Sequence, residues 1–260
     1  MTTSYPHPIW NSIEKIRFEP TFDLAVQHLK TIGRAIDIPS FAIIPDVSSA
    51  LPPVVDFCAG EAAASTAYQS YRSRYLERQI SSKSPIHNAC RLASLPFVWR
   101  TDGPWSIPME LERHHRRVLT FFADHGRTGG LSVPVHGPGG RVSSLRFYLI
   151  NAGESEVDLE GVLQEHKSAL SMAGLYIMDK FWRQTASNAS VPSFTLRELD
   201  CLRLAAKGLS DKCIAIRLDV SPTTVRYYMD NAVRKLEATN RVQAVGKAAQ
   251  FGLLTSALAR

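Results

Sequence analysis

The chain has 260 residues, of which 45% are hydrophobic, and it carries a net charge of +6. That apolar fraction can form packed cores and excludes a wholly disordered chain, and no run approaches the roughly 18 apolar residues of a membrane span. The N-terminal residues lack a basic segment followed by an apolar one, and the four scattered cysteines include no CxxC pair. We therefore expect no signal peptide, and a cytoplasmic protein with reduced thiols.

Periodicity predicts a mixed first domain. In chain order the expected elements are an amphipathic helix over 22–36, a short strand over 41–45, a helix over 110–124, two strands over 131–136 and 141–150, and a long helix over 158–183. Residues 137–140, Gly-Pro-Gly-Gly, are typical of a hairpin turn between the two strands. Helices and hairpin-linked strands together indicate an α+β fold, an antiparallel sheet with helices on both faces.

Small polar residues and a proline interrupt this pattern at 184–193, QTASNASVPS. We assign residues 1–183 to a first domain, 184–193 to a linker and 194–260 to a second domain. Residues 190–260 hold eleven Lys or Arg and six Asp or Glu, a net of +5, whereas the other 189 residues hold nineteen and eighteen, a net of +1. A compact basic domain indicates a polyanionic partner, most commonly nucleic acid.

Capping signals predict an all-α, four-helix second domain. Thr195 and Glu198 form a capping box, and Gly208 is suited to end the helix that they open. Its buried stripe is expected at Leu199, Leu202 and Ala206. Ser210 caps a second helix over 211–218, and Ser221 caps a third with a proline at its first position. This order of elements predicts a helix-turn-helix.

In a helix-turn-helix one helix braces against the DNA backbone while the next enters the major groove. Arg226 lies near the start of the third helix, where arginine can pair with guanine through two hydrogen bonds. Further contacts on this segment are expected from Ser221, Thr223, Thr224, Tyr227, Asp230 and Arg234, and phosphate contacts from Lys212, Lys235 and Arg241. Val225, Met229 and Ala232 are expected to hold the helix to its domain. An ordinary four-helix domain with a solvated basic face is the alternative.

Residues 193–254 closely resemble the C-terminal DNA-binding domain of LuxR-type transcription regulators. The matching positions are Thr195, Arg197, Glu198, Leu202, Gly208, Ser210, Ile214, Ala215, Leu218, Ser221, Thr224, Val225, Lys235, Leu236, Arg241, Ala244, Gly252 and Leu253. The resemblance implies sequence-specific binding of double-stranded DNA.

The first domain resembles the autoinducer-binding domain of quorum-sensing receptors, over a longer stretch with a weaker match. Residues 121–140, FFADHGRTGGLSVPVHGPGG, are similar to the family's segment around its invariant glycine, which falls at Gly130. The resemblance places Tyr75 on the tyrosine that binds the signal's amide carbonyl, and Trp99 on a further family tryptophan.

Two positions depart from that family's pattern. Tyr71 stands where the family has a tryptophan for the lactone carbonyl, and Ser84 where it has the aspartate that accepts the amide N–H. Because a serine brings no charge, that contact would lose its charge-assisted strength. We therefore expect weak response to a simple acyl-homoserine lactone.

Three tyrosines and one arginine are candidate ligand contacts on their own pattern, independently of the resemblance. Tyr68, Tyr71 and Tyr75 share one helical face, either as an aromatic core stripe or as the polar tips of a pocket. Alternation along the strand 141–150 puts Arg146 on the face opposite Phe147. If helices cover both faces, the guanidinium needs a partner, which is an internal carboxylate, water at an exposed edge, or an anionic ligand. The predicted ligand-contacting set is Tyr71, Tyr75, Ser84, Trp99, Ser132 and Arg146.

These features predict a ligand-responsive transcription regulator that binds a palindromic DNA site as a homodimer. The expected partners are double-stranded DNA, a small signal (an acyl-homoserine lactone or an atypical relative) and RNA polymerase, with no cofactor, metal or membrane. One rival is a regulator whose first domain is a ligand-independent, heterodimerising interaction module. An enzyme domain is disfavoured, since GxSxG, HExxH and metal-like Cys/His spacings are absent, and His114 and His115 are expected at the surface.

Overall fold

The computed structural model describes residues 8–49, 53–58, 66–137, 140–150, 157–185 and 192–254. The chain divides into two compact units, with the change near residue 186. Within the described ranges, no helix combines the length and the low charge that crossing a bilayer requires.

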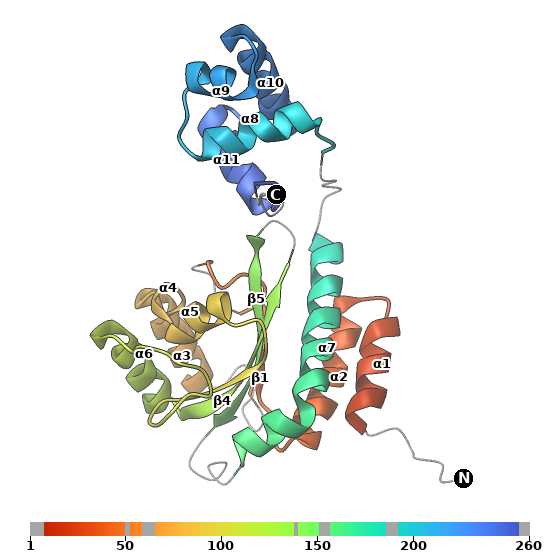
Figure 1. Ribbon diagram of the computed structural model, residues 1–260. Coiled ribbons are helices and arrows are strands. Elements are labelled where there is room, and N and C mark those ends of the chain that lie inside the picture. The colour runs from red at the N-terminus through yellow and green to blue at the C-terminus, as the bar shows by residue number, and fades with distance from the viewer. Residues whose placement is uncertain are drawn as a thin grey trace. The chain divides into compact units, whose positions relative to one another are not determined.

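A five-stranded antiparallel sheet organises the first unit (Figure 1). Its strands are β1 (Phe41–Ile44), β2 (Val55–Phe57), β3 (Phe97–Arg100), β4 (Arg127–His136) and β5 (Val142–Ile150). They lie in the order β2-β1-β5-β4-β3, so the long hairpin of β4 and β5 occupies the middle of the sheet. Pro138 and Gly139 of the predicted hairpin loop lie outside the described residues.

Helices cover both faces of this sheet, as expected for the α+β class. The first face is covered by α1 (Pro8–Phe18), α2 (Phe22–Ala35) and α7 (Leu159–Thr185) (Figure 1). The second face is covered by α3 (Thr66–Glu77), α4 (Ile80–Lys83), α5 (Pro85–Leu92) and α6 (Arg113–Asp124). The two faces therefore bury two separate sets of side chains.

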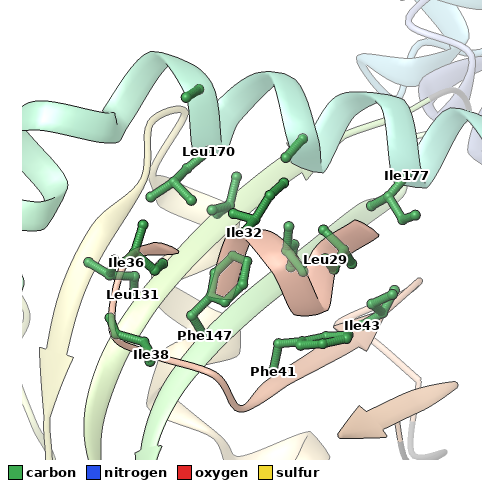
Figure 2. Packing of buried hydrophobic residues seen from close by; sticks show 14 of the residues in the cluster. Leu29, Ile32, Ile36, Ile38, Phe41, Ile43, Leu131, Phe147, Leu170 and Ile177 are labelled. Carbon is green, nitrogen blue, oxygen red and sulfur yellow. The ribbon is translucent and has the colours of Figure 1, made fainter. Parts of the chain in front are cut away.

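The core of the first face is mainly aliphatic. Figure 2 shows Leu131 and Phe147 of the central strands pointing toward Leu170 and Ile177 of α7. The backbones of β4 and β5 approach closely at Gly130, where an added Cβ would lie 2.1 Å from the carbonyl oxygen of Phe147. Only glycine fits at that position, which gives a physical reason for the glycine identified in the sequence.

In its described part, residues 192–254, the second unit consists of four helices and is all-α as predicted. They are α8 (Leu196–Ala206), α9 (Asp211–Leu218), α10 (Pro222–Lys235) and α11 (Arg241–Gln250). Thr195, Ser210 and Ser221 each cap a helix through a side-chain oxygen that accepts from a backbone N–H three residues on. Gly208 takes a φ of +81°, the left-handed conformation that ends α8.

Several sequence expectations need correction. The helix expected over 110–124 begins at Arg113, because Glu112 and His115 form a capping box there. His115 is buried, with Nε2 3.2 Å from Asn88 Nδ2, so its expected surface position is wrong. The strand expected over 131–136 begins four residues earlier, at Arg127.

The expected stripe of α8 is also partly wrong. Leu202 is buried, but Leu199 is half-buried and Ala206 is exposed. The buried residues of the helix are Glu198, Cys201, Leu202 and Leu204.

Candidate functional site

The second face of the sheet carries a small pocket. Its lining residues are Ala42, Pro53, Asp56, Tyr71, Tyr75, Trp99, Phe122, Arg127, Arg146 and Tyr148. They come from all five strands of the sheet, from α3 and α6, and from the segment before β2. The cavity has a volume of about 20 Å³, which is room for about one water molecule.

Arg146 enters the pocket from the middle of the sheet. It lies on β5 opposite Ala42 of β1 and Ser132 of β4, so neighbouring strands surround it on both sides. Its exposed fraction is 6%, which rules out the exposed sheet edge considered from the sequence. In the part of the chain that the structure describes, neither Nε nor Nη2 of Arg146 has a hydrogen-bond partner. These two nitrogens form one edge of the guanidinium, the edge that can grip a carboxylate through two parallel hydrogen bonds.

The acidic residue of the pocket, Asp56, is engaged elsewhere. Its Oδ2 lies 3.7 Å from Arg127 Nη2, and its Oδ1 accepts a hydrogen bond from the Tyr148 hydroxyl. The Arg127 guanidinium also lies 3.7 Å from the centre of the Tyr71 ring, a cation–π contact. The internal carboxylate considered for Arg146 is thus committed to Arg127. Sequence reasoning did not single out Asp56, Arg127 or Tyr148, because their pairing joins strands far apart in the chain.

Burial controls protonation in this pocket. It raises the pKa of the tyrosines Tyr71, Tyr75 and Tyr148 above their ordinary value, so their hydroxyls keep their protons at neutral pH. Burial, together with the charge of Arg146, lowers the pKa of His87 to about 3, so His87 is neutral.

The tautomer of His87 follows from its contacts. Nδ1 lies 2.9 Å from the carbonyl oxygen of Ser81, which can only accept, so Nδ1 carries the proton. Nε2 is then an acceptor, and it has no partner among the described residues. His87 is a buried residue of α5 that does not line the cavity. The sequence did not reveal it, since a single histidine on a helix carries no distinctive spacing.

The structure brings most of the predicted ligand set together. Tyr71, Tyr75, Trp99 and Arg146 line the pocket. Ser84 and Ser132 are not among the lining residues, although both are buried and their hydroxyls have no partner among the described residues. The two interpretations of the tyrosine stripe coexist, because Tyr68, Tyr71 and Tyr75 belong to the aromatic core of this face and two of them also line the cavity.

The second unit presents the predicted recognition helix, α10. Val225, Met229 and Ala232 are buried against the domain, as expected. The exposed residues of the helix include Thr223, Arg226, Tyr227, Asp230 and Arg234, while Thr224 is half-buried. Ser221 is occupied as the N-cap, and its hydroxyl lies 3.0 Å from the backbone N of Thr224.

The three cations assigned to phosphate differ in their surroundings. Lys212 on α9 is exposed. Lys235 Nζ lies 2.6 Å from Oε2 of Glu198, the capping-box residue of α8. Arg241 forms an ion pair with Asp211 and donates to the Leu209 carbonyl oxygen at 2.7 Å. Lys235 and Arg241 therefore join helices within the domain, whatever they contact on DNA.

The fold and the two sites define a class of protein, a helix-turn-helix DNA-binding regulator joined to an α+β domain with an internal pocket. Comparison with known families gives the particular one. Residues 192–248 match the bacterial regulatory proteins of the luxR family, and residues 56–181 match the autoinducer binding domain.

Curated relatives cover most of the chain. The transcriptional activator protein VanR of Vibrio anguillarum is 30% identical over 186 residues, covering 71% of this chain and 74% of VanR. The transcriptional activator protein AhyR of Aeromonas hydrophila is 29% identical over 229 residues, covering 86% of this chain and 82% of AhyR. The chain belongs to the LuxR family of quorum-sensing transcription regulators, with an autoinducer-binding domain and a LuxR-type DNA-binding domain.

Solved structures agree on the fold. SdiA of Escherichia coli aligns with a TM-score of 0.59 at 18% identity, covering 95% of this chain and 98% of SdiA. CepR2 of Burkholderia cenocepacia aligns with a TM-score of 0.50 at 16% identity, covering 67% of this chain and 96% of CepR2.

Proposed function

We propose that this protein is a ligand-responsive transcription regulator that binds an inverted-repeat DNA site as a homodimer. Residues 1–183 form the sensing and dimerisation domain, 184–193 the linker and 194–260 the DNA-binding domain. The protein acts in the cytoplasm with RNA polymerase as a further partner, and it needs no metal or organic cofactor.

One observation carries the sensing part of this proposal. A buried guanidinium edge of Arg146, without a partner among the described residues, lies in a pocket of the domain that matches autoinducer-binding proteins. Buried polar groups are nearly always hydrogen-bonded, so an unmet donor pair marks a place built to receive acceptor atoms. The proposed contacts are Tyr71, Tyr75, Ser84, Trp99, Ser132 and Arg146. A related fold, SdiA, is described in complex with octanoyl-rac-glycerol, which supports a small-molecule occupant.

The proposed dimer is supported by the small number of base pairs that one helix-turn-helix can contact. One recognition helix contacts too few base pairs for genomic specificity, and two-fold proteins match palindromic sites. The exposed face of α10 supplies Arg226 and Tyr227 for base edges. Capping hydroxyls and basic side chains nearby, including Ser221 and Lys212, are proposed to hold the phosphates.

The small size of the cavity favours a second candidate function, a ligand-independent interaction module. A cavity of about 20 Å³ is far below the roughly 300 Å³ of common ligand sites. A first domain packed this closely is also suited to be an interaction module that heterodimerises with another receptor without any ligand. In that case no small molecule stabilises the protein.

Selection from a random duplex pool tests the DNA-binding part. The enriched sites should be inverted repeats whose half-sites lie about one helical turn apart, ~34–36 Å. Extraction of the purified protein followed by mass spectrometry tests the sensing part, with a stoichiometric small molecule as the expected result. Enrichment of single half-sites would refute the dimer, and repeated purification without any small molecule favours the interaction module.

A further inference from the structure

The pocket has a surplus of hydrogen-bond donors. Arg146 offers Nε and Nη2, and Trp99 offers Nε1, and none of these nitrogens has a partner in the described ranges. Arginine and tryptophan nitrogens can only donate. Ser132, directly opposite Arg146 across the β4–β5 ladder, adds a hydroxyl without a partner among the described residues. The Ser84 hydroxyl, which can donate or accept, and Nε2 of neutral His87, which accepts, are also without partners in the described ranges, but neither residue lines the cavity. A molecule that completes this set must bring mainly acceptors.

The charges of the lining residues also favour a ligand that brings acceptors, and in particular an anion. Among the described residues, the ionisable side chains that line the cavity with a full charge are Asp56, Arg127 and Arg146. Asp56 neutralises Arg127, with which it forms an ion pair inside the pocket. The tyrosine hydroxyls are neutral because burial raises the pKa of Tyr71, Tyr75 and Tyr148. One positive charge is therefore left over, on Arg146, and a buried charge is costly unless it is paired.

The shape of the free edge selects the kind of anion. Nε and Nη2 lie in one plane and point the same way, which matches the two oxygens of a carboxylate. A phosphate monoester carries a charge of −1.5 to −2 near pH 7, more than one guanidinium neutralises. The walls are aromatic, from Tyr71, Tyr75, Trp99 and Phe122. They suit a flat apolar body, and the small volume means that these rings must move to admit it.

We propose that the pocket recognises its signal through a carboxylate that pairs with the Nε–Nη2 edge of Arg146, so that the signal is an organic monocarboxylic acid with a flat apolar body. This rests on the proposed function, since it takes the pocket to be the sensing site.

Matched pairs of acids and amides test the proposal. Benzoate, phenylacetate and 3-phenylpropionate are each compared with the corresponding carboxamide, which has the same shape without the charge. Binding is measured by titration calorimetry and by the melting temperature of the first unit, followed through tryptophan fluorescence. At about a hundred times its Kd, at least one acid should raise that melting temperature by on the order of 5–10 °C, and its amide should have little effect.

Three variants test whether Arg146 is the residue that binds the acid. Arg146→Met should weaken binding of the acid by on the order of 100-fold and remove the preference for acid over amide. Arg146→Lys keeps the charge but loses the paired edge, so it should recover only part of the affinity. Arg100→Met is the matched control, because Arg100 lies at the end of β3 with its own partner, Glu160, at 2.7 Å and does not line the pocket. It should bind the acid as wild type does.

The outcomes separate this inference from the proposed function. Equal stabilisation by acids and amides, or an acid preference that survives in Arg146→Met, overturns the carboxylate proposal. If octanoyl-rac-glycerol or N-octanoyl homoserine lactone stabilises the protein and no acid does, the pocket is a sensing site of a different class, and only this inference fails. If neither class stabilises the protein, sensing itself fails along with it.

Discussion

Two buried arginines on one sheet face should respond in opposite ways to the same substitution. Arg127 is paired with Asp56 at 3.7 Å, whereas Nε and Nη2 of Arg146 have no partner in the described part of the chain. Arg127→Met strands the Asp56 carboxylate, and breaking a buried pair in this way costs about 3–5 kcal/mol of the free energy of unfolding. Arg146→Met removes a charge that is already uncompensated. We therefore expect the free energy of unfolding of the unliganded protein to be unchanged or raised by about 1–2 kcal/mol.

Urea denaturation followed by tryptophan fluorescence measures both effects. The four tryptophans, Trp10, Trp99, Trp105 and Trp182, all lie in the first unit, so this signal reports its unfolding alone. With an m value of about 2–3 kcal/mol per molar urea, the midpoint of Arg127→Met should fall by about 1–2 M.

A double variant supplies the control for this experiment. Asp56→Leu combined with Arg127→Met removes both charges, so it should recover much of the stability that Arg127→Met loses. A loss in Arg146→Met as large as that in Arg127→Met would refute the reasoning, because it would mean that Arg146 also has an internal partner.

Three further predictions concern the DNA-binding domain. Arg226→Ala should cost about 1–3 kcal/mol of binding free energy on the selected site and relax the preference at one base pair per half-site. Lys212→Ala should weaken binding to all sequences alike and make the slope of log K against log salt shallower by about 1. Unchanged DNA binding by both variants would exclude α10 as the recognition helix. Inserting about five base pairs between half-sites should abolish tight binding and a full-turn insertion should cost less, whereas equal affinity in a mobility-shift assay would indicate independent monomers. Burial alone would raise the pKa of Glu198, but hydrogen bonds from Lys235 and the Thr195 backbone lower it below its ordinary value of 4.5. The Glu198–Lys235 pair therefore stabilises the folded domain at pH values above 4.5, and this contribution is lost as the pH falls through the lowered pKa. The protection factors of the α8 amides, which correct for the pH dependence of intrinsic hydrogen exchange, should therefore fall on acidification in wild type and change less in Glu198→Gln.

The candidate DNA interface was largely predictable because its signals are local. Capping boxes, a proline at the first helical position and a glycine at the helix end act over three or four residues, so Thr195, Ser210, Ser221 and Gly208 fix where helices begin and end. The contacts of Lys235 were not predictable in the same way. Its partner, Glu198, lies on another helix, and the sequence does not show which face of each helix meets the other.

In the first domain, the sequence by itself determined which side chains share a face. Strand alternation separates Arg146 from Phe147, and helical spacing groups Tyr71 with Tyr75, whatever packs against them. Tertiary structure alone decided which charges are paired. Asp56 on an edge strand and Arg127 on β4 come together through the order β2-β1-β5-β4. Nε and Nη2 of Arg146, on β5, are left without a partner among the described residues. Strand order is set by burial of the whole sheet and not by any local run of residues. The face of the sheet that carries Arg146 could therefore be predicted from the sequence. That Nε and Nη2 of Arg146 have no partner among the described residues could not.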